Sequence, residues 1–389
     1  MERLVTSNLK LGIIAGGQLA KMLIQEASKW DIITYVLDND AHCPARSIAS
    51  HYVQGSHLDY EDVYQFGKEV DLLTYELEAI NIEALKQLKK EGYTIVPDPD
   101  TLEMIQDKGK QKEFYRHHQI PTSPFKLYQN AIEIHQDIKL GNLPLPFVQK
   151  LRTGGYDGRG VAVMETEADL GKMLEGESLI EDKISIDKEV AVIVARNRKG
   201  EIKCFPVVEM IFDSKANLVD KLICPSTLSS EQAEEAKKIS AQIAELLQYE
   251  GVLAIEFFID QNGKVLVNEM APRPHNSGHH TIESMITSQF EQHLRAILNL
   301  PLGSTELKLP SVMVNILGAE GEVGPVRYEG LTESMAVEGV KIHLYGKKIT
   351  KPFRKMGHVT ILAKTPEAAM EKAEQIKHLI QVKAWEQPS

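Results

Sequence analysis

Apolar residues along the first hundred positions are spaced in a way that predicts strands alternating with helices. Strands are predicted at residues 9–15, 32–37, 71–75 and 93–96, and helices at residues 18–29 and 82–90. Gly16-Gly17 marks a tight turn at the carboxyl end of the first strand. Such alternation is typical of a doubly wound parallel sheet, which binds its ligands at the carboxyl ends of its strands.

A different pattern follows Pro97-Asp98-Pro99, so the first domain is expected to close near residue 100. Helices are predicted at residues 101–118, 131–139, 229–247 and 289–298, and strands at residues 178–184, 189–196 and 204–210. Ser229 and Ser230 are candidate caps for the longest of these helices. A break at Pro301-Leu302-Gly303 indicates a second boundary, which divides the chain into residues 1–100, 101–303 and 304–389.

A predicted β-hairpin carries two carboxylates that face each other. Residues 252–259 have strand composition, Asn262-Gly263 is a strong signal for a two-residue turn, and residues 264–269 return. Counting outward from this turn places Glu256 opposite Glu269. Because opposed like charges destabilise a sheet, the pair favours a hard divalent cation held by oxygen ligands, typically Mg²⁺ with a nucleotide phosphate.

The hairpin pattern alone leaves an alternative open, in which both carboxylates are solvated and one of them takes up a proton. Asn268 offers a third oxygen ligand, but strict alternation along the strand directs its side chain to the opposite face. Asn268 joins the two carboxylates only if the strand bends at that position.

Two glycine-rich loops are candidates for phosphate binding. The first, at residues 15–20, is a poor dinucleotide fingerprint because Ala15 and Ala20 stand where two glycines belong, so the following helix N-terminus is expected to receive another phosphate. The second, at residues 152–160, is rich in glycine and arginine but lacks the Gly-Lys-Ser/Thr of a P-loop. A mobile hairpin tip is the alternative for this loop, although Lys150 just before it favours a flap over a nucleotide.

Two further segments combine cationic and polar side chains. Residues 268–280 contain three histidines without the spacing of a zinc protease, which favours a bound anion near Arg273 and His275. Residues 345–358 contain a basic cluster that suits a phosphate or an exposed hairpin equally well.

The composition narrows the class of protein. A chain of 389 residues with 43% hydrophobic and 25% charged residues is ordinary for a soluble protein of two or three domains. Its formal net charge of −11 argues against a nonspecific nucleic-acid binder. We find no apolar run long enough for a membrane span or a signal peptide, and three cysteines without metal-ligand spacing suit a reducing compartment. A cytoplasmic enzyme without nucleic-acid or membrane partners is therefore expected.

Five motifs, taken in order along the chain, resemble those of the ATP-grasp superfamily and, within it, of the N5-carboxyaminoimidazole ribonucleotide synthetases. They are Gly-Gly-Gln-Leu at 16–19, Thr-Tyr-Glu at 74–76, Thr-Gly-Gly-Tyr-Asp-Gly-Arg-Gly at 153–160, Asn-Glu-Met-Ala-Pro-Arg-Pro-His-Asn-Ser-Gly-His at 268–279 and Arg-Lys-Met-Gly-His at 354–358. The resemblance covers nearly the whole chain, and Ala15 and Ala20 depart from its usual glycines.

The resemblance implies an α/β protein with an ATP-grasp fold. Its N-terminal domain would be a doubly wound parallel sheet that precedes the ATP-grasp domain. The central ATP-grasp domain would consist of a small lobe with the glycine-rich flap, residues 101–180, and a metal and nucleotide lobe, residues 181–303. A small C-terminal domain would complete the chain.

The resemblance also implies a homodimeric ligase that converts 5-aminoimidazole ribonucleotide, bicarbonate and ATP, with Mg²⁺ or Mn²⁺, into the N5-carbamate, ADP and phosphate. Residues 181–184 would be the hinge against adenine, Glu189 would bind the ribose hydroxyls of ATP, and Asp157 would orient or deprotonate the amine of the substrate. The implied ATP ligands are Lys108, Lys150, Gly155, Gly158, Gly160, Glu181, Asp182, Lys183, Ile184, Glu189, Asn268 and Glu269; the metal ligands Glu256, Glu269 and Asn268; the catalytic residues Tyr156, Asp157, Arg159, Arg273 and His275; and the ribotide ligands Gln18, Glu76, Asn276, Lys347, Arg354 and Lys355.

Three alternatives compete with this interpretation. Another ATP-grasp ligase, such as a formate-dependent glycinamide ribonucleotide transformylase or a biotin carboxylase, would share the carboxylate pair and the flap. A nicotinamide-dependent oxidoreductase is supported only by the degenerate loop at residues 15–20. A catalytically silent nucleotide-binding regulator is disfavoured by the intact set of acidic, basic and glycine-rich elements.

Overall fold

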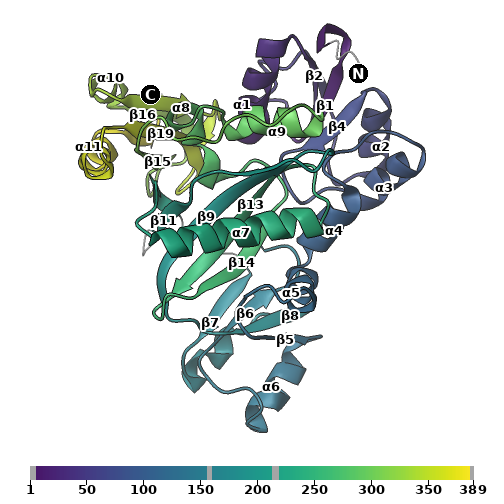
Figure 1. Ribbon diagram of the computed structural model, residues 1–389, viewed down its shortest axis with the longest axis vertical. Helices are drawn as coiled ribbons and strands as arrows, with labels where there is room; N and C mark the ends of the chain where they lie inside the picture. The colour runs from purple at the N-terminus through teal and green to yellow at the C-terminus, as the bar shows by residue number, and fades with distance from the viewer. Residues whose placement is uncertain (1–5, 156–159, 213–218, 386–389) are drawn as a thin grey trace.

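The computed structural model describes residues 6–155, 160–212 and 219–385 (Figure 1). Its N-terminal part is a parallel four-stranded sheet with the strand order β3-β2-β1-β4. The strands are β1 Lys10–Ile14, β2 Ile33–Asp38, β3 His51–Gln54 and β4 Leu72–Tyr75. The helices of this part are α1 Gln18–Ala27, α2 Tyr60–Lys68 and α3 Ile82–Lys90.

Helices cover both faces of this parallel sheet, because neighbouring residues of a strand point to opposite sides. Ile13 packs in one core cluster with residues of α1 and of α9 (Gln289–Ile297), and Ile14 packs in another cluster with residues of α2 and α3. Helix α9 lies beside α1 although it is far away in the sequence (Figure 1). The doubly wound sheet is thus confirmed, and one of its covering helices comes from the central part of the chain.

The centre of the molecule is a nine-stranded sheet with the order β14-β13-β9-β11-β12-β15-β19-β17, where β10 pairs with β9 off this path. Its strands are β9 Ile186–Arg196, β10 Ile202–Cys204, β11 Val208–Phe212, β12 Val219–Cys224, β13 Gly251–Asp260, β14 Val265–Ala271, β15 Ser311–Leu317, β17 Val340–Leu344 and β19 Lys355–Leu362. The predicted boundary at residues 303/304 falls inside this sheet, because β15 pairs with β12. The domain limits remain a prediction.

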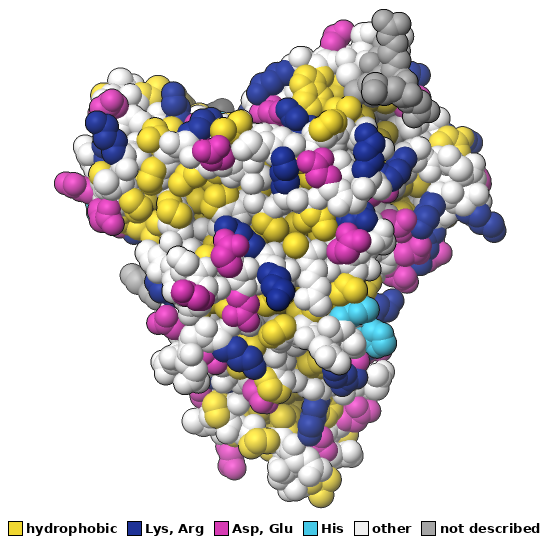
Figure 2. Space-filling model, in the orientation of Figure 1, with side chains coloured by type: hydrophobic (Ala, Val, Ile, Leu, Met, Phe, Trp, Pro, Cys, Tyr) yellow, Lys and Arg dark blue, Asp and Glu magenta, His cyan; other side chains and the backbone are white. Residues whose placement is uncertain are grey.

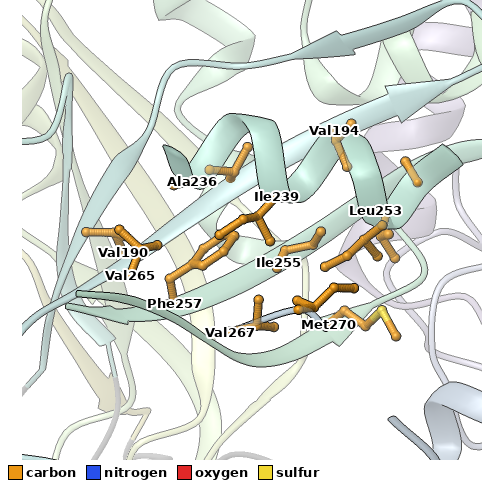
Figure 3. Close-up of a cluster of buried hydrophobic side chains, with 14 of the residues drawn as sticks. Val190, Val194, Ala236, Ile239, Leu253, Ile255, Phe257, Val265, Val267 and Met270 are labelled. Carbon is orange, nitrogen blue, oxygen red and sulfur yellow. The ribbon is translucent and has the colours of Figure 1, made fainter. Parts of the chain in front are cut away.

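Alternation along β9 and β13 builds two cores, one on each side of the central sheet. Val190, Val194, Leu253 and Phe257 face helix α7 (Ser230–Leu246), which crosses the sheet (Figures 1 and 3). The residues between them, such as Ala191 and Ile193, pack on the opposite side with residues of the α8 to α9 region. Both faces of the central strands are therefore buried, which explains why these segments are nearly continuous apolar runs.

Two smaller sheets flank the central one. The small lobe is a sheet of order β5-β8-β6-β7, with β5 Phe125–Tyr128, β6 Phe147–Leu151, β7 Val161–Met164 and β8 Ser178–Asp182, and it carries α6 Ala131–Lys139. The C-terminal part adds a sheet of order β18-β16-β20, with β16 Gly324–Glu329, β18 Ile349–Thr350 and β20 Gln381–Ala384. The remaining helices are α4 Pro99–Gln106, α5 Lys108–His117, α8 Thr281–Ser284, α10 Leu331–Met335 and α11 Pro366–Leu379.

Three predicted elements differ from the structure. The helix predicted at residues 101–118 is two helices, α4 and α5, because Asp107 has extended backbone between them and caps α5 through the N–H groups of Gly109 and Lys110. The strand predicted at residues 93–96 is only an isolated bridge from Ile95 to Leu73. The strand predicted at residues 204–210 is split between β10 and β11.

The molecular surface mixes charges of both signs. Lys and Arg side chains alternate with Asp and Glu side chains over the face shown in Figure 2, with apolar side chains between them. Within the described part of the chain, the helices are too short or too polar to cross a membrane.

Candidate active site

The hairpin of β13 and β14 places Glu256 directly opposite Glu269, as the sequence predicts. Two deviations from the predicted register cancel each other. The loop has three residues instead of two, since Asp260 and Lys264 close it and Gly263 takes the left-handed φ of +80°. Beyond Phe257, which pairs with Val267, a β-bulge inserts one extra residue and restores the predicted pairing.

Asn268 is the extra residue of this bulge, so the bend on which its role as a ligand depends is present. A bulge re-aims the side chain that it carries. The Oδ1 atom of Asn268 accepts a hydrogen bond of 2.9 Å from Nζ of Lys150. The strand therefore directs Asn268 to a lysine of the predicted ATP site.

The two opposed carboxyl groups differ in their electrostatic surroundings. Burial favours the neutral form of Glu269, but its ion pair with Lys108 and the charge of Lys150 outweigh burial and lower its pKa to about 2. Burial and the nearby charge of Glu269 raise the pKa of Glu256 to about 8. At neutral pH the pair therefore carries about one negative charge, and Glu256 still holds a proton that it can lose.

Glu256 also meets the ring of His275, whose Nε2 lies 3.6 Å from Oε1 of Glu256. The Nδ1 atom of His275 accepts the N–H of Ser277, so a neutral ring carries its proton on Nε2, on the side of Glu256. His275 follows the end of β14, and the loop after this strand brings the ring back to the carboxylate pair.

A divalent cation fits this donor set. Mg²⁺ prefers oxygen ligands, and the site offers two opposed carboxylates and an amide oxygen. Burial and the charge of Glu269 are what keep a proton on Glu256. The described residues contain no group of three or more His, Cys, Asp or Glu side chains placed to hold a metal by themselves. The remaining ligands would have to come from phosphate oxygens or water.

A buried group of charges lies between the two lobes of the central part. Glu181 of β8 is 3% exposed and contacts two lysines, with Nζ of Lys112 at 2.5 Å from its Oε1 and Nζ of Lys150 at 2.6 Å from its Oε2. Ser123 donates a hydrogen bond of 2.6 Å to the same carboxylate. Burial opposes ionisation, yet the two lysines lower the pKa of Glu181 to about 2.

Lys112 is the member of this group that the sequence did not reveal. It lies on α5, is 2% exposed, and contacts Oγ1 of Thr122 at 2.5 Å; Thr122 in turn donates to the carbonyl oxygen of Val267 in β14. Burial lowers the pKa of Lys112 to about 8, against the attraction of Glu181. A lysine in a helix is usually solvated, so its position in the sequence carries no signal of this role.

The residues of the predicted adenine hinge, 181–184, make different contacts. The carboxylate of Glu181 points into the buried charge group, so only its backbone is left to meet a nucleotide. The N–H of Asp182 donates to the carbonyl oxygen of Pro124, and exposed Lys183 pairs with Glu165. Glu189 on β9 is largely buried, and burial raises its pKa to about 7.

A cleft of about 400 Å³ contains the residues predicted to bind the ribotide. They come from the start of α1 and the end of β4, from the loop after β14, and from the segment that runs from the end of β17 to the start of β19. The predicted residues in its wall are Gln18, Glu76, Arg273, His275, Asn276, Lys347, Arg354 and Lys355. Leu19, Leu77, His279 and Phe353 complete the lining and were not predicted.

Glu76 lines this cleft and also caps helix α1. Its carboxylate accepts the N–H groups of Gly17 and Ala20 at the start of α1, the latter at 2.7 Å. Burial raises the pKa of Glu76 to about 7 against these two hydrogen bonds. The expectation that a phosphate binds this helix N-terminus is therefore wrong for these donors, because the carboxylate of Glu76 already occupies them.

The cationic residues of the cleft are held by neighbouring groups. The guanidinium of Arg273 lies 2.7 Å from Glu78, an acid that the sequence did not indicate. Lys347 donates to the carbonyl oxygen of Lys355 at 2.8 Å, and Arg354 donates to that of Ile349 at 2.6 Å.

The predicted flap is only partly described. Tyr156, Asp157, Gly158 and Arg159 lie outside the described residues. Gly155 and Gly160 border that gap, and Gly160 has the left-handed φ of +74°. The carbonyl oxygen of Gly160 accepts the N–H of Leu151, which follows Lys150 in β6.

Known domain families match three parts of the chain. The ribonucleotide synthetase preATP-grasp domain matches residues 9–106, the ATP-grasp domain residues 113–290, and the phosphoribosylaminoimidazole carboxylase C-terminal domain residues 311–372. The N5-carboxyaminoimidazole ribonucleotide synthase of Bacillus subtilis is 35% identical over 371 residues, which are 94% of each chain. The chain belongs to the N5-carboxyaminoimidazole ribonucleotide synthetase family.

Solved structures agree with membership of this synthetase family. The Thermotoga maritima N5-carboxyaminoimidazole ribonucleotide synthetase superposes with a TM-score of 0.90 at 45% identity, covering 97% of this chain and 100% of that one. The Aspergillus clavatus N5-carboxyaminoimidazole synthase in complex with ADP and 5-aminoimidazole ribonucleotide has a TM-score of 0.88 at 29% identity, covering 96% and 99%. The predicted superfamily, family and ATP-grasp fold are confirmed, and the chain is an ATP-grasp ligase.

One relative is longer than this synthetase chain. The chloroplastic phosphoribosylaminoimidazole carboxylase of Vigna aconitifolia is 38% identical over 361 residues, which are 90% of this chain but 64% of that protein. The chain therefore spans less than two thirds of that plant protein.

Proposed function

We propose that the chain carboxylates 5-aminoimidazole ribonucleotide with bicarbonate and ATP, giving N5-carboxyaminoimidazole ribonucleotide, ADP and phosphate in purine biosynthesis. The observation that carries this proposal is the position of His275. Its ring lines the cleft that gathers the predicted ribotide ligands, and its Nε2 lies 3.6 Å from Glu256 of the carboxylate pair. One side chain therefore connects the proposed ribotide cleft with the proposed nucleotide site.

The nucleotide would bind between the two lobes. Lys108 and Lys150, which pair with Glu269 and Glu181, would offset the charge of its phosphates, and Glu189 would bind its ribose hydroxyls. Glu256, Glu269 and Asn268 would hold Mg²⁺, which would supply positive charge to offset the negative charge of the phosphates.

The cleft would hold the reacting groups next to that nucleotide. An oxygen of bicarbonate would attack the γ-phosphorus, and ADP would leave. The amine nitrogen of the ribotide would then attack the carboxyl carbon and give up a proton, with Asp157 as the proposed acceptor, while the C–O bond to phosphate breaks and phosphate is released. Arg273 and His275 would hold the bicarbonate and its phosphorylated form. Tyr156, Asp157 and Arg159 keep their proposed roles in the flap and in orienting the amine. Water must be kept out, because the mixed anhydride is lost to hydrolysis when exposed.

The basic residues of the segment between β17 and β19 would grip the ribotide phosphate. Lys347, Arg354 and Lys355 line one stretch of the cleft wall, and Arg is able to bind a phosphate with two parallel hydrogen bonds. Gln18, Glu76 and Asn276 line the same cleft, where Glu76 would act mainly through α1. A homodimer and a cytoplasmic location also remain predictions.

Phosphate release from MgATP tests the proposal. We expect release by the wild type to require both the ribotide and bicarbonate, and to fall by at least about a hundredfold in Glu269→Gln, because this change removes charge at the metal and leaves Lys108 without its partner. Glu329→Gln serves as the matched control and is expected to behave as wild type, because this acid of β16 is partly exposed and pairs with Arg327 and Lys383, outside the proposed site. Release that is indifferent to the ribotide would contradict the proposal and direct the search to other amines.

A further inference from the structure

We propose that Phe353 determines specificity for the ribotide by covering the apolar faces of its sugar and imidazole ring. This role rests on the proposed function, since it presupposes a ribotide in the cleft. Phe353 lies in the turn between β18 and β19 and lines the cleft beside Lys347, Arg354 and Lys355. It is thus a large apolar ring next to the group of cations proposed to bind the phosphate.

The backbone at Phe353 is strained. Its φ is +61°, in the left-handed region that side chains with a Cβ rarely adopt. Among the described residues other than glycine, the remaining left-handed ones are Ala15, Asp31, Gln119, Gln248 and Asn299. All of these are small or polar, so Phe353 is the bulky apolar exception within the described part of the chain. Glycine would suit this turn better on conformational grounds alone.

Two backbone hydrogen bonds fix the turn in this conformation. The N–H of Phe353 donates to the carbonyl oxygen of Gly318 at 2.8 Å, and the N–H of Gly318 donates to that of Arg354 at 2.9 Å. The close approach requires glycine at position 318, because a Cβ there would lie 2.1 Å from the carbonyl oxygen of Lys351. The ring is therefore presented by a rigid turn, and its direction is set by the same contacts that place Arg354.

The ring also remains incompletely buried. Phe353 is 43% exposed, although a phenylalanine gains stability when it is covered. Strained conformations and exposed aromatic rings both carry a cost, and both are typical of binding sites, where a ligand covers the exposed surface. A ligand that joins a phosphate to a flat ring through a sugar matches this wall, because the cations take its anionic end and Phe353 takes the apolar part that follows.

This arrangement would also let the cleft discriminate between the ribotide and simple phosphates. Inorganic phosphate would meet the cations alone, whereas the ribotide would bury the ring as well. Phe353 therefore selects for the organic part of the substrate.

Steady-state kinetics of Phe353→Ala and Phe353→Gly test the inference. The alanine variant removes the ring and keeps the strain, whereas the glycine variant removes both. We expect both to raise the KM for the ribotide about five- to tenfold, with kcat and the KM for ATP within about twofold of wild type. Inhibition by inorganic phosphate, competing with the ribotide, should keep its wild-type constant. The glycine variant should be thermally more stable than the alanine variant, because it also relieves the backbone strain.

Asn299→Gly is the matched control, because it relaxes a left-handed residue, with φ of +55°, that does not line the cleft. Its KM for the ribotide should stay at the wild-type value. Wild-type turnover that requires the ribotide is established in the same assay, so failure of the proposed function would be seen there. A wild-type KM for the ribotide in both ring variants would overturn the role of Phe353 and leave the proposed function intact. An equal rise in the KM values for ribotide and ATP would also overturn it.

Discussion

Lys112 and Glu181 show how single buried residues set the charges of the proposed site. The family resemblance implies Lys150 and Glu181 as nucleotide ligands, and the structure joins them in one buried group with Lys112. The turn signal of Asn262-Gly263 predicts a hairpin, and the predicted pairing of Glu256 with Glu269 is correct only because the three-residue loop and the β-bulge offset each other. The ion pair of Glu181 with Lys112 could not be predicted, because the contact between α5 and β8 is tertiary and leaves no local signal in the sequence.

Two single substitutions in the buried group of Lys112, Lys150 and Glu181 should lower the free energy of unfolding by different amounts. Glu181→Gln leaves two buried lysines without their counter-charge and should lower the free energy of unfolding by about 3–5 kcal/mol. Lys112→Met leaves Glu181 paired with Lys150 and replaces the lysine by an apolar chain of similar length, so the loss should be no more than about 2 kcal/mol. Urea unfolding at pH 7 measures both. Equal losses would show that Lys150 alone does not satisfy Glu181.

At the scale of elements, the positions of the helix N-termini determine where several residues of the proposed site lie. Sequence periodicity placed the helices at residues 82–90 and 131–139 correctly, but it joined α4 and α5. The missing signal is a tertiary one: Arg152 contacts both oxygens of Asp107, at 3.0 and 2.5 Å, and this pair fixes the cap from which Lys108 reaches Glu269. In the same way, Glu76 caps α1 from a strand that lies 59 residues from Gly17 in the sequence.

The turn into α1 predicts opposite effects for two identical substitutions. Ala15 has φ of +70°, so Ala15→Gly should relieve strain and raise the free energy of unfolding by up to about 1 kcal/mol, after the entropy of glycine in the unfolded chain is subtracted. Ala20 lies inside α1 and is completely buried, so Ala20→Gly should lower it by about 1 kcal/mol. Urea unfolding of the two variants compares them directly. Destabilisation by both would mean that the turn at Ala15 is not strained.

At the scale of the whole molecule, the proposed site depends on how the parts of the chain are joined. The cleft takes residues from segments that are more than 250 positions apart, for example Gln18 and Lys347. Periodicity cannot bring such segments together, and only the family resemblance predicts that they share one site. The junction itself is carried by α9, whose His293 contacts Oγ1 of Thr74 in the N-terminal sheet at 3.1 Å and accepts the N–H of Val252 in β13 at 3.2 Å.

This junction predicts that acid weakens the protein. Burial lowers the pKa of His293 to about 3, so the folded chain keeps the ring neutral while the unfolded chain takes up a proton below about pH 6.5. The folded pKa lies below the unfolded one, so stability is full above about pH 6.5 and falls as the pH drops towards 3. Between pH 7.5 and 5.5 this single group should cost about 1.4 kcal/mol.

His293→Gln removes the titrating group, so it isolates this contribution to acid sensitivity. The variant should be less stable than wild type at pH 7.5, because it disturbs the contacts to Thr74 and Val252, but it should lose about 1.4 kcal/mol less than wild type when the pH is lowered to 5.5. His378→Gln, at an exposed position on α11, should keep the wild-type pH dependence. Urea unfolding at the two pH values measures all three proteins. If His293→Gln showed the same loss as wild type, the acid sensitivity would have to reside in other buried histidines, such as His280, and the neutral ring would not be what ties the N-terminal sheet to the central one.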